Sequence, residues 1–267
     1  MNSKGIYEQY DEAADLLKFL TSSNVRTGIL LSLNESSKNL TGLKQDLNLE
    51  SSTIIHGTSK LEKRDLIFKN GEKYSLSQIG KIFALKLINL IKTIDTIKSH
   101  EKLWLNHEID RIPEELLLKI GDLNDSILIK SDFTNINKPH TNFIQLLKQT
   151  KKMKGVSPVY HPDFPEIIAT LISKGVDIQL IVTISILKIL NRGILNELLS
   201  KKNFKLYVID EEVREAFTVT DNFISFGLFI VDGIYDYSMD LISDDKNAIV
   251  WGQKLFEYYL KKSKKVN

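Results

Sequence analysis

Hydroxyl, imidazole and amine side chains between residues 51 and 73 are of the types that hydrogen-bond to nucleic acid. Serine, threonine and histidine can contact base edges, whereas lysine and arginine neutralise phosphates. We expect base-edge contacts from Ser51, Ser52, Thr53, His56 and Ser59. The basic side chains expected to contact the DNA backbone or its grooves are Lys38, Lys44, Lys60, Lys63, Arg64, Lys69 and Lys73.

The elements that must position these side chains can be predicted from the spacing of apolar residues. Leucines at three- and four-residue spacing predict a helix over residues 38–48. A turn at residues 49–50 then leads to a second helix over residues 52–64. The hydroxyls of Ser51 and Ser52 are expected to cap the amino end of this second helix.

The second helix is predicted to bury one face and to be followed by a hairpin. Ile54, Ile55 and Leu61 are its predicted core residues. Residues 66–76 predict two short strands joined by a basic, glycine-containing tip. Helix, turn, helix and hairpin in this order form the layout of a winged helix-turn-helix DNA-binding domain, assigned to residues 1–76. The alternative is a generic helical subdomain with a solvated hairpin.

A long apolar stripe follows this predicted domain. Apolar residues recur at alternating steps of four and three over residues 75–107, a pattern that predicts a helix of about 30 residues. We expect residues 77–110 to connect the domains and to pair with a second copy of the chain, forming a homodimer. The alternative is a connector packed against its own C-terminal domain. The expected dimer contact residues are Phe83, Leu87, Leu90, Ile94 and Ile97.

Residues 111–267 show a different pattern, with apolar strand-like runs that alternate with amphipathic helices. Such alternation predicts an α/β domain with a sheet rich in parallel strands. Within this part we expect strands over residues 178–183 and 204–209, and helices over residues 165–174 and 186–200. After residue 209 the helices stop. Three consecutive strands are predicted over residues 217–220, 223–230 and 235–242, before a last helix over residues 244–262. The predicted fold is therefore a two-domain chain, α+β at the amino end and α/β at the carboxyl end.

Composition excludes several classes of function. The chain has no cysteine, which rules out disulfides and thiolate chemistry, and its net charge of +2 is too small to indicate a nucleic-acid partner by itself. No apolar run approaches the roughly 20 residues of a membrane span, and the N-terminus lacks a signal-peptide core. We expect a cytoplasmic protein without a membrane partner.

Residue types that can catalyse a reaction or bind a metal ion do not form a recognisable pattern in this sequence. The five histidines are scattered, and the two that lie one heptad apart, His100 and His107, fit solvated helix positions. Asp232, Asp236 and Asp240 are explained by turn and edge polarity. The dispersed glycines form no phosphate-binding loop. The sequence therefore predicts no enzyme, no catalytic residue, no metal and no cofactor.

Aromatic residues are frequent between residues 204 and 237 and indicate a different role for the C-terminal domain. Aromatics in strands are ordinarily core residues, but some can line an apolar cavity that binds a small molecule. We expect a small effector, apolar or anionic, with the Arg214 guanidinium paired to any anionic group. The expected effector-binding residues are Tyr160, His161, Thr183, Arg214 and Phe226.

Four segments carry a resemblance to a known family. Residues 161–166 (HPDFPE), 226–229 (FGLF), 232–236 (DGIYD) and 251–259 (WGQKLFEYY) resemble the C-terminal domain of archaeal winged-helix regulators. These are the Fil-type regulators of methanogens, named after a methanogenesis regulatory protein. The resemblance extends over nearly the whole chain. It implies a transcription regulator whose C-terminal domain senses a ligand or dimerises.

The α/β part also resembles one half of a phospholipase D-type fold, more faintly. Enzymes of that class use a His-x-Lys-x4-Asp motif in which the histidine attacks phosphorus. In the matching frame, which ends at Asp221, Arg214 stands in place of the histidine and Ala216 in place of the lysine. A guanidinium stays protonated and cannot attack, so this route to phosphodiester cleavage is closed.

The residues together predict a homodimeric, sequence-specific DNA-binding transcription regulator whose C-terminal domain binds a small effector. Two alternatives stay open at this point. One is a phosphodiesterase-like enzyme with an accessory DNA-binding module. The other is a C-terminal domain that acts only in dimerisation or in binding a protein partner.

Overall fold

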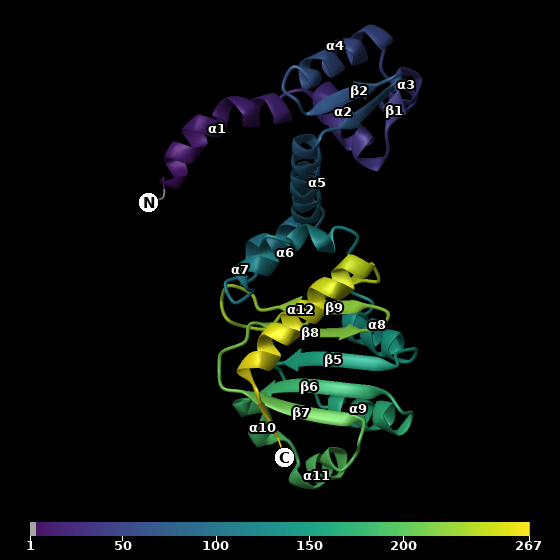
Figure 1. Cartoon of the computed structure of the whole chain (residues 1–267). Coiled ribbons are helices and arrows are strands. Elements are labelled where there is room, and N and C mark those ends of the chain that lie inside the picture. The colour runs from purple at the N-terminus through teal and green to yellow at the C-terminus, as the bar shows by residue number, and fades with distance from the viewer. Residues whose placement is uncertain (1–3, 267) are drawn as a thin grey trace. The chain divides into compact units, whose positions relative to one another are not determined.

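A computed structural model of the chain describes residues 4–266 and has two parts, both of mixed α and β structure. The chain divides into two compact units, residues 1–90 and 91–267, and the division falls inside a helix (Figure 1). The termini of the predicted domains, residues 1 and 267, lie outside the described residues. Within the described part, no helix is both long and apolar enough to cross a membrane.

The N-terminal unit packs three helices, α2, α3 and α4, against a three-stranded antiparallel sheet of order β1-β3-β2, and α1 contacts α2. Its core residues include Ile29, Leu43, Ile54 and Leu61, each fully buried. The elements are α1 (Ile6–Thr21), α2 (Asn24–Glu35), β1 (Lys38–Asn39), α3 (Leu40–Leu47), α4 (Ser51–Glu62), β2 (Ile67–Asn70) and β3 (Lys73–Leu76).

Local capping explains the tight turn between α3 and α4. Asn39 begins α3 by accepting a hydrogen bond from the backbone N–H of Gly42 at 2.9 Å. Asn48 ends it in the left-handed region, with φ of 49°, a conformation that asparagine tolerates better than most residues. Helix, turn, helix and hairpin therefore follow one another as expected from the sequence.

Three details of this unit differ from the sequence prediction. The helix expected from residue 38 begins at residue 40, because Lys38 and Asn39 pair with β3. The cap of α4 is Glu50 rather than a serine, and it makes no side-chain capping bond. Ile55 is 49% exposed, because it lies one helical position away from the buried face that Ile54 occupies.

The predicted helix of about 30 residues is interrupted. It forms α5 (Gln78–Ser99) and a short α6 (Glu101–Asn106), separated by His100, whose backbone leaves the helical region at φ −129° and ψ 34°. Nε2 of His100 lies 3.1 Å from the carbonyl oxygen of Ser126, a contact that fixes the break. Leu76, predicted as the start of the helix, belongs to β3 instead.

The expected dimer contact residues do not share one environment. Leu87 is buried in the core of the N-terminal unit, and Phe83 packs against that core. Leu90, Ile94 and Ile97 are 48%, 44% and 44% exposed. The first two residues are therefore already occupied within the chain, and the available part of the stripe is its second half.

The C-terminal unit is built on an eight-stranded mixed sheet of order β11-β7-β6-β5-β8-β9-β10-β4. Only β5, β6 and β7 run parallel to one another, and the other pairings are antiparallel. The strands are β4 (Ile127–Lys130), β5 (Lys152–Ser157), β6 (Asp177–Thr183), β7 (Phe204–Ile209), β8 (Glu215–Thr220), β9 (Ile224–Leu228), β10 (Met239–Ser243) and β11 (Lys264–Lys265).

Helices cover both faces of this sheet, so each strand alternates between two apolar cores. On one face, α12 (Lys246–Lys262) crosses the strands and buries Trp251 and Phe256 against them (Figure 1). The unit also contains α7 (Glu114–Leu117), η1 (Ile120–Leu123), α8 (Lys138–Leu147), α9 (Phe164–Ser173), α10 (Ile184–Ile189) and α11 (Arg192–Leu199). Of these, α8 to α11 supply residues to the core of the other face.

Three expectations for this unit are corrected. The sheet is not parallel-rich, because only β5, β6 and β7 pair in parallel and every other strand pairing is antiparallel. The single helix expected over residues 186–200 is split into α10 and α11 at Asn191, whose side chain caps α11. The last strand begins at Met239 rather than at Tyr235, after a segment of turns.

Candidate functional site

The outward face of α4 carries the side chains that the sequence assigned to base contacts. Thr53 and His56 are exposed, and with Ser52 and Lys60 they border an open hollow between α4 and the start of α2. Ser51 and Ser59 are half-buried. The residues that line the hollow are Ser23, Val25, Arg26, Ser52, Thr53, His56, Gly57 and Lys60. Ser23 and Arg26 were not predicted, because only the tertiary contact of α2 with α4 brings them here.

Gly57 allows this close contact. A Cβ atom at Gly57 would lie 2.8 Å from Ile29 Cδ1 and 2.9 Å from Val25 Cγ1, nearer than side chains tolerate. The absence of a side chain at Gly57 therefore lets α4 pack closely against α2.

The hairpin after α4 presents two lysines. Lys69 on β2 and Lys73 on β3 are exposed, and Gly71 between them has a positive φ of 60° that the tight turn requires. The Lys69 amine lies 5.4 Å from the centre of the Tyr74 ring. The hairpin therefore displays positive charge at its tip, as expected.

Two of the predicted DNA-contacting cations are already paired within the chain. Arg64 forms an ion pair of 2.7 Å with Asp15 of α1, and its guanidinium lies over the Phe19 ring. Lys38 pairs with Asp46 and with Glu35, and these carboxylates raise the pKa of its amine. Both cations therefore already have a carboxylate partner within the unit, and their phosphate contacts stay predictions.

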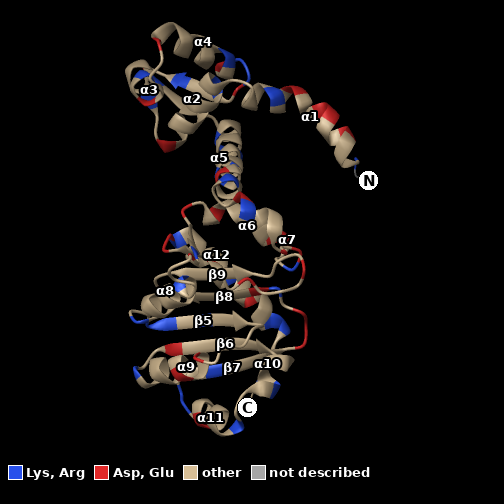
Figure 2. Cartoon of the chain, turned by 180° about the vertical axis from the view of Figure 1, so that it is seen from behind, with Lys and Arg blue, Asp and Glu red and all other residues tan. Residues whose placement is uncertain are grey.

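The remaining basic residues do not form a patch of one sign. Figure 2 shows Lys and Arg mixed with Asp and Glu on the N-terminal unit, with acidic residues gathered along α1. Lys60 and Lys63 are exposed, whereas Lys44 is half-buried on α3. Any attraction of DNA must therefore come from a few local cations rather than from a broad positive field.

The C-terminal unit holds a mostly apolar cavity of about 220 Å³. It lies between the sheet and helices α8, α9, α10 and α11, and side chains such as Phe143, Phe164 and Leu195 form its walls. Four polar residues of the sheet reach its lining, namely Ser157, Thr218, Ser225 and Asp240. An apolar space with a few polar groups is the usual form of a small-molecule site.

Asp240 is the most unusual of these polar groups. It lies on β10, a strand between β9 and β4, and it is 8% exposed. The Ser225 hydroxyl donates a hydrogen bond of 2.6 Å to its carboxylate. Burial raises the pKa of Asp240 to about 7. The sequence interpretation of Asp240 as edge polarity is wrong, since the residue is interior and faces the cavity.

Gly227 leaves room for the hydroxyl group of Tyr235, another polar group of the cavity lining. The Tyr235 hydroxyl occupies the space beside Gly227, where a Cβ atom would lie only 2.1 Å from the hydroxyl oxygen. Tyr235 lines the cavity and stacks edge-on against Phe229 and Tyr237. Burial raises the pKa of its phenol, so the hydroxyl stays protonated.

The five predicted effector-binding residues are not brought together. Tyr160 and His161 lie in the cavity wall. Phe226 does not, because adjacent residues of a strand face opposite sides of the sheet: Ser225 faces the cavity, and Phe226 points to the other face and contacts Trp251. Thr183 instead caps α10 through a hydrogen bond from the backbone N–H of Ile186.

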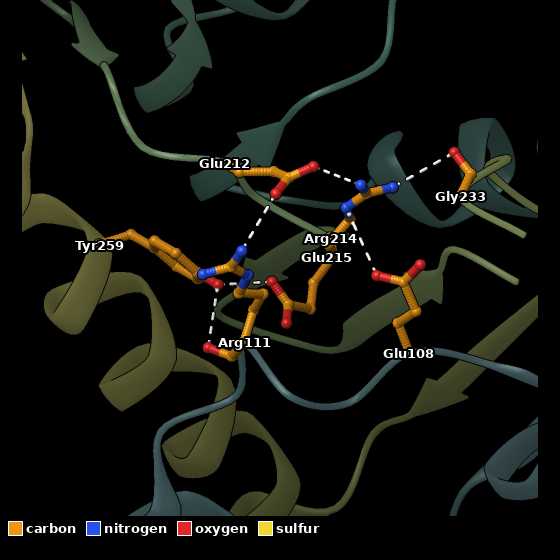
Figure 3. Close-up of polar contacts among 7 residues, drawn as sticks. All are labelled: Glu108, Arg111, Glu212, Arg214, Glu215, Gly233 and Tyr259. Carbon is orange, nitrogen blue, oxygen red and sulfur yellow. Dashed lines mark hydrogen bonds and ion pairs between the residues drawn. The ribbon is translucent and has the colours of Figure 1, made fainter. Parts of the chain in front are cut away.

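Arg214 is also absent from the cavity wall, and its charge is already neutralised. Figure 3 shows its guanidinium between Glu108 and Glu212, with a hydrogen bond of 3.3 Å to the carbonyl oxygen of Gly233. The Arg214 ion pair with Glu108 measures 3.4 Å. Its predicted role as the partner of an anionic effector is therefore corrected.

The same cluster contains a buried carboxyl group. Glu215 is completely buried at the start of β8 and accepts a hydrogen bond from the Tyr259 hydroxyl (Figure 3). Its second oxygen, Oε1, has no hydrogen-bond partner among the described residues. Burial raises the pKa of Glu215 to about 7. Glu215 and Asp240 are thus two buried acids on opposite faces of one sheet.

The histidines also differ from the prediction. His100 and His107 are buried rather than solvated, and Nε2 of His107 lies 3.1 Å from Asp236. His140 and His161 are far apart in sequence, yet their rings stack with centroids 3.9 Å apart in the cavity wall. Spacing along the chain gave no signal for this pair.

Comparisons with known proteins identify the family. The N-terminal domain of the methanogenesis regulatory protein FilR1 matches residues 14–95, and its middle domain matches residues 136–262. The chain belongs to this family. FilR1 of Methanothrix harundinacea (strain 6Ac) is 28% identical over 258 residues, which cover 94% of this chain and 58% of the relative. This chain therefore spans little more than half the length of the curated FilR1 protein that it matches.

Solved structures similar to this chain are distant from it. TrmBL2, an archaeal chromatin protein, matches with a TM-score of 0.44 and 13% identity, covering 96% of this chain and all of that one. NucT from Helicobacter pylori matches with a TM-score of 0.42 and 14% identity, covering 53% of this chain and 98% of that one. The FilR1 family match, rather than these likenesses, identifies the family of the chain.

Proposed function

We propose that this member of the FilR1 family is a transcription regulator that binds double-stranded operator DNA through a winged helix-turn-helix in residues 1–76. The observation that carries the proposal is the exposed polar face of α4, with Thr53 and His56 outward and a basic hairpin directly after it. A helix that reads DNA needs such a face, because base edges are recognised by hydrogen bonds in the major groove.

In this proposal α4 enters the major groove and the hairpin contacts the backbone or the minor groove. Ser52, Thr53 and His56 approach base edges, while Lys60 and Lys63 contact phosphates. The hollow beside α4 adds Ser23 at the amino end of α2, where the helix dipole favours a phosphate. A regulator of this kind acts on the chromosome, and the proposal therefore includes a cytoplasmic location.

The experiment is selection of binding sites from a pool of random duplexes with the full chain, followed by titration of the enriched duplex. We expect Thr53→Ala and His56→Ala to lower affinity for that duplex by roughly 1–3 kcal/mol for each base contact that is removed. Affinity for unrelated duplexes should change little, because phosphate contacts remain. Lys205→Ala, an exposed change on β7, is the control. Failure to enrich any sequence would contradict the proposal.

A second proposal concerns the C-terminal unit, which we infer binds a small effector in the cavity. Support comes from the apolar walls and from the buried Asp240, Ser225 and Thr218 that face the space. These groups replace the predicted set around Arg214 and Phe226. Thermal-shift screening of small amphipathic molecules tests it: the melting temperature should rise with a binder, and Leu195→Trp, which fills the cavity, should abolish that rise.

The relation of this unit to a phospholipase D-type half is also part of the proposal. Asp221, the last residue of the matching frame, accepts hydrogen bonds from the backbone N–H groups of Lys151 and Lys152. Arg214, at the position of the nucleophile, is held between two carboxylates. In this interpretation the frame has become structural, and the fold serves ligand binding rather than hydrolysis.

Dimerisation through the exposed half of α5 completes the proposal. Leu90, Ile94 and Ile97 lie along one stripe of the helix and remain accessible. Paired copies would present two recognition helices, as operators with two half-sites require.

A further inference from the structure

The wall of the cavity contains a group of side chains with the chemistry of a metal site. His140, His161 and Asp163 each offer one ligand atom, and these three atoms all lie within 4.8 Å of one another. His140 lies in the first turn of α8, and His161 and Asp163 lie in the loop before α9. Two segments that are separate in sequence therefore bring together two imidazoles and a carboxylate.

The distances suit a tetrahedral ion. Nε2 of His140 is 3.4 Å from Oδ2 of Asp163, and Nδ1 of His161 is 3.8 Å from the same oxygen. Ligand atoms about 2.0–2.2 Å from a tetrahedral zinc ion are separated from one another by roughly 3.3–3.6 Å. A small closing of the loop would bring all three atoms into the first coordination sphere.

The carboxylate of Asp163 is oriented in an unusual way. Asp163 is the residue before α9, where an aspartate ordinarily accepts a hydrogen bond from the backbone of the first turn. Here it makes no such bond, and its backbone is αR rather than extended. Its carboxylate lies beside the two imidazoles instead. The Asp163 side chain therefore does not cap α9 and instead contacts two imidazoles that can bind a metal ion.

Hydrogen bonding shows which ring nitrogen of His161 carries the lone pair. An imidazole binds a metal ion through an unprotonated nitrogen, which otherwise accepts hydrogen bonds. The backbone N–H of Asp163 donates to Nδ1 of His161 at 3.2 Å, a contact that solvent can replace because Asp163 is exposed.

We propose that His140, His161 and Asp163 bind one divalent transition-metal ion, of which Zn²⁺ is the model, at the wall of the cavity. Two nitrogen ligands and one carboxylate select zinc-like ions over Mg²⁺, which prefers oxygen ligands and retains its waters. Three protein ligands leave a fourth position for water or for a bound molecule. The site requires neither DNA binding nor an effector, so it can be tested separately from both.

The test uses the full chain, freed of metal by a chelator and titrated with Co²⁺ and Zn²⁺ at pH 7.5. We expect one ion per chain, with the visible absorption of tetrahedral Co²⁺ and its loss when Zn²⁺ is added. Mg²⁺ should neither bind there nor displace Co²⁺. An absorption typical of octahedral Co²⁺ or a site that Mg²⁺ fills equally well would overturn the proposal.

Substitutions locate the site. His140→Gln, His161→Gln and Asp163→Asn should each weaken Zn²⁺ binding by more than about 100-fold, since changes to outer-shell partners alone cost about 10–100-fold. Asp177→Asn, the same chemical change at an exposed aspartate outside the cavity wall, is the matched control and should bind as the unmodified chain does. Circular dichroism and the melting temperature without metal show whether each variant is folded, and the conservative Asp163→Asn keeps the test decisive if a histidine variant unfolds. Metal binding that survives all three changes, or no stoichiometric binding at all, would refute the site.

Discussion

The two candidate sites differ in how the chain exposes its polar groups. In the N-terminal unit, polar side chains lie on the outer face of α4 and on a hairpin tip, where water solvates them and a partner can reach them. In the C-terminal unit, polar side chains of β8, β9 and β10 face an apolar cavity, and Thr218, Ser225 and Asp240 are nearly inaccessible. The first arrangement suits a large charged partner, and the second suits a small molecule that must itself be desolvated.

The difference also determines how each site affects stability. An exposed polar residue contributes little to the free energy of unfolding, so α4 can be changed for recognition at small cost. A buried carboxyl group must remain neutral or be paired, so the residues around Asp240 affect folding as well as binding. Substitutions on α4 should therefore change binding without changing stability. Substitutions around Asp240 should change both binding and stability.

The largest effect that we expect concerns the two buried acids. In the folded chain the pKa values of Asp240 and Glu215 are both raised to about 7, whereas in the unfolded chain they return to ordinary values near 4. The folded state then holds more protons between about pH 4 and pH 7. Because stability falls with rising pH wherever the folded state binds more protons, each acid lowers stability through this window, with no further change above it.

Asp240→Asn and Glu215→Gln should remove this penalty. Each is expected to raise the free energy of unfolding at pH 8, relative to the unmodified chain, by roughly 2–4 kcal/mol before losses from altered hydrogen bonds. Little difference should remain near pH 4. Urea unfolding at a series of pH values measures the effect, with the exposed Asp177→Asn as control. Parallel pH profiles for variants and unmodified chain would show that neither acid is held neutral.

The second effect tests the packing of the cavity lining. Gly227→Ala would place a methyl group against the Tyr235 hydroxyl, and we expect a loss of roughly 1–3 kcal/mol of stability from overpacking. Adding Tyr235→Phe removes the hydroxyl and should restore part of that loss. The double-mutant cycle is measured by urea unfolding. Simple additivity of the two changes would mean that the glycine is not needed for the tyrosine.

The contrast between the sites also explains what the sequence could predict. Helix periodicity, turn residues and a basic hairpin are local signals, and they located α3, α4 and the β2–β3 hairpin to within a few residues. The same signals located β6, β7 and α9. The predictions failed where the environment of a residue depends on segments that are far away in the sequence. Phe226 and Ser225 are adjacent on β9, and only the register with β8 and β10 shows which of them faces the cavity.

Three further failures share this cause. Arg214 was expected to be available for an effector, but Glu108, more than a hundred residues away, pairs with it. At His100, where the long helix is interrupted, the imidazole contacts Ser126, 26 residues further along the chain. His140 and His161 meet only because α8 and the loop before α9 border the same cavity. In each case the deciding partner lies outside any window in which periodicity is detected.

The third effect concerns assembly and separates the two halves of the apolar stripe on α5. Leu90→Glu combined with Ile94→Glu should dissociate a dimer held by the exposed half of the α5 stripe, because like charges would be buried in the interface between the two helices. Folding should be nearly unaffected, since both side chains are about half exposed. Molar mass from light scattering is the measurement. Leu85→Glu makes the same chemical change at an exposed leucine away from this stripe and is the control. An unchanged dimer mass in the double variant would place the interface elsewhere.

The smallest effect tests whether the hairpin binds DNA without reading its sequence. Lys69→Ala combined with Lys73→Ala removes two exposed cations, and the slope of log affinity against log salt should fall by about 1 for each cation that pairs with a phosphate. Affinity should fall similarly for the selected duplex and for unrelated duplexes, because phosphates are the same in both. Arg64→Ala provides an internal comparison, because Arg64 pairs with Asp15 within the unit. Its removal should alter the packing of α1 and leave the salt slope unchanged. Fluorescence anisotropy at several salt concentrations measures the salt slope of the double lysine variant and of Arg64→Ala. If the lysine variant kept the full slope while Arg64→Ala reduced it, the DNA-facing surface would lie on the α1 side of the unit rather than on the hairpin.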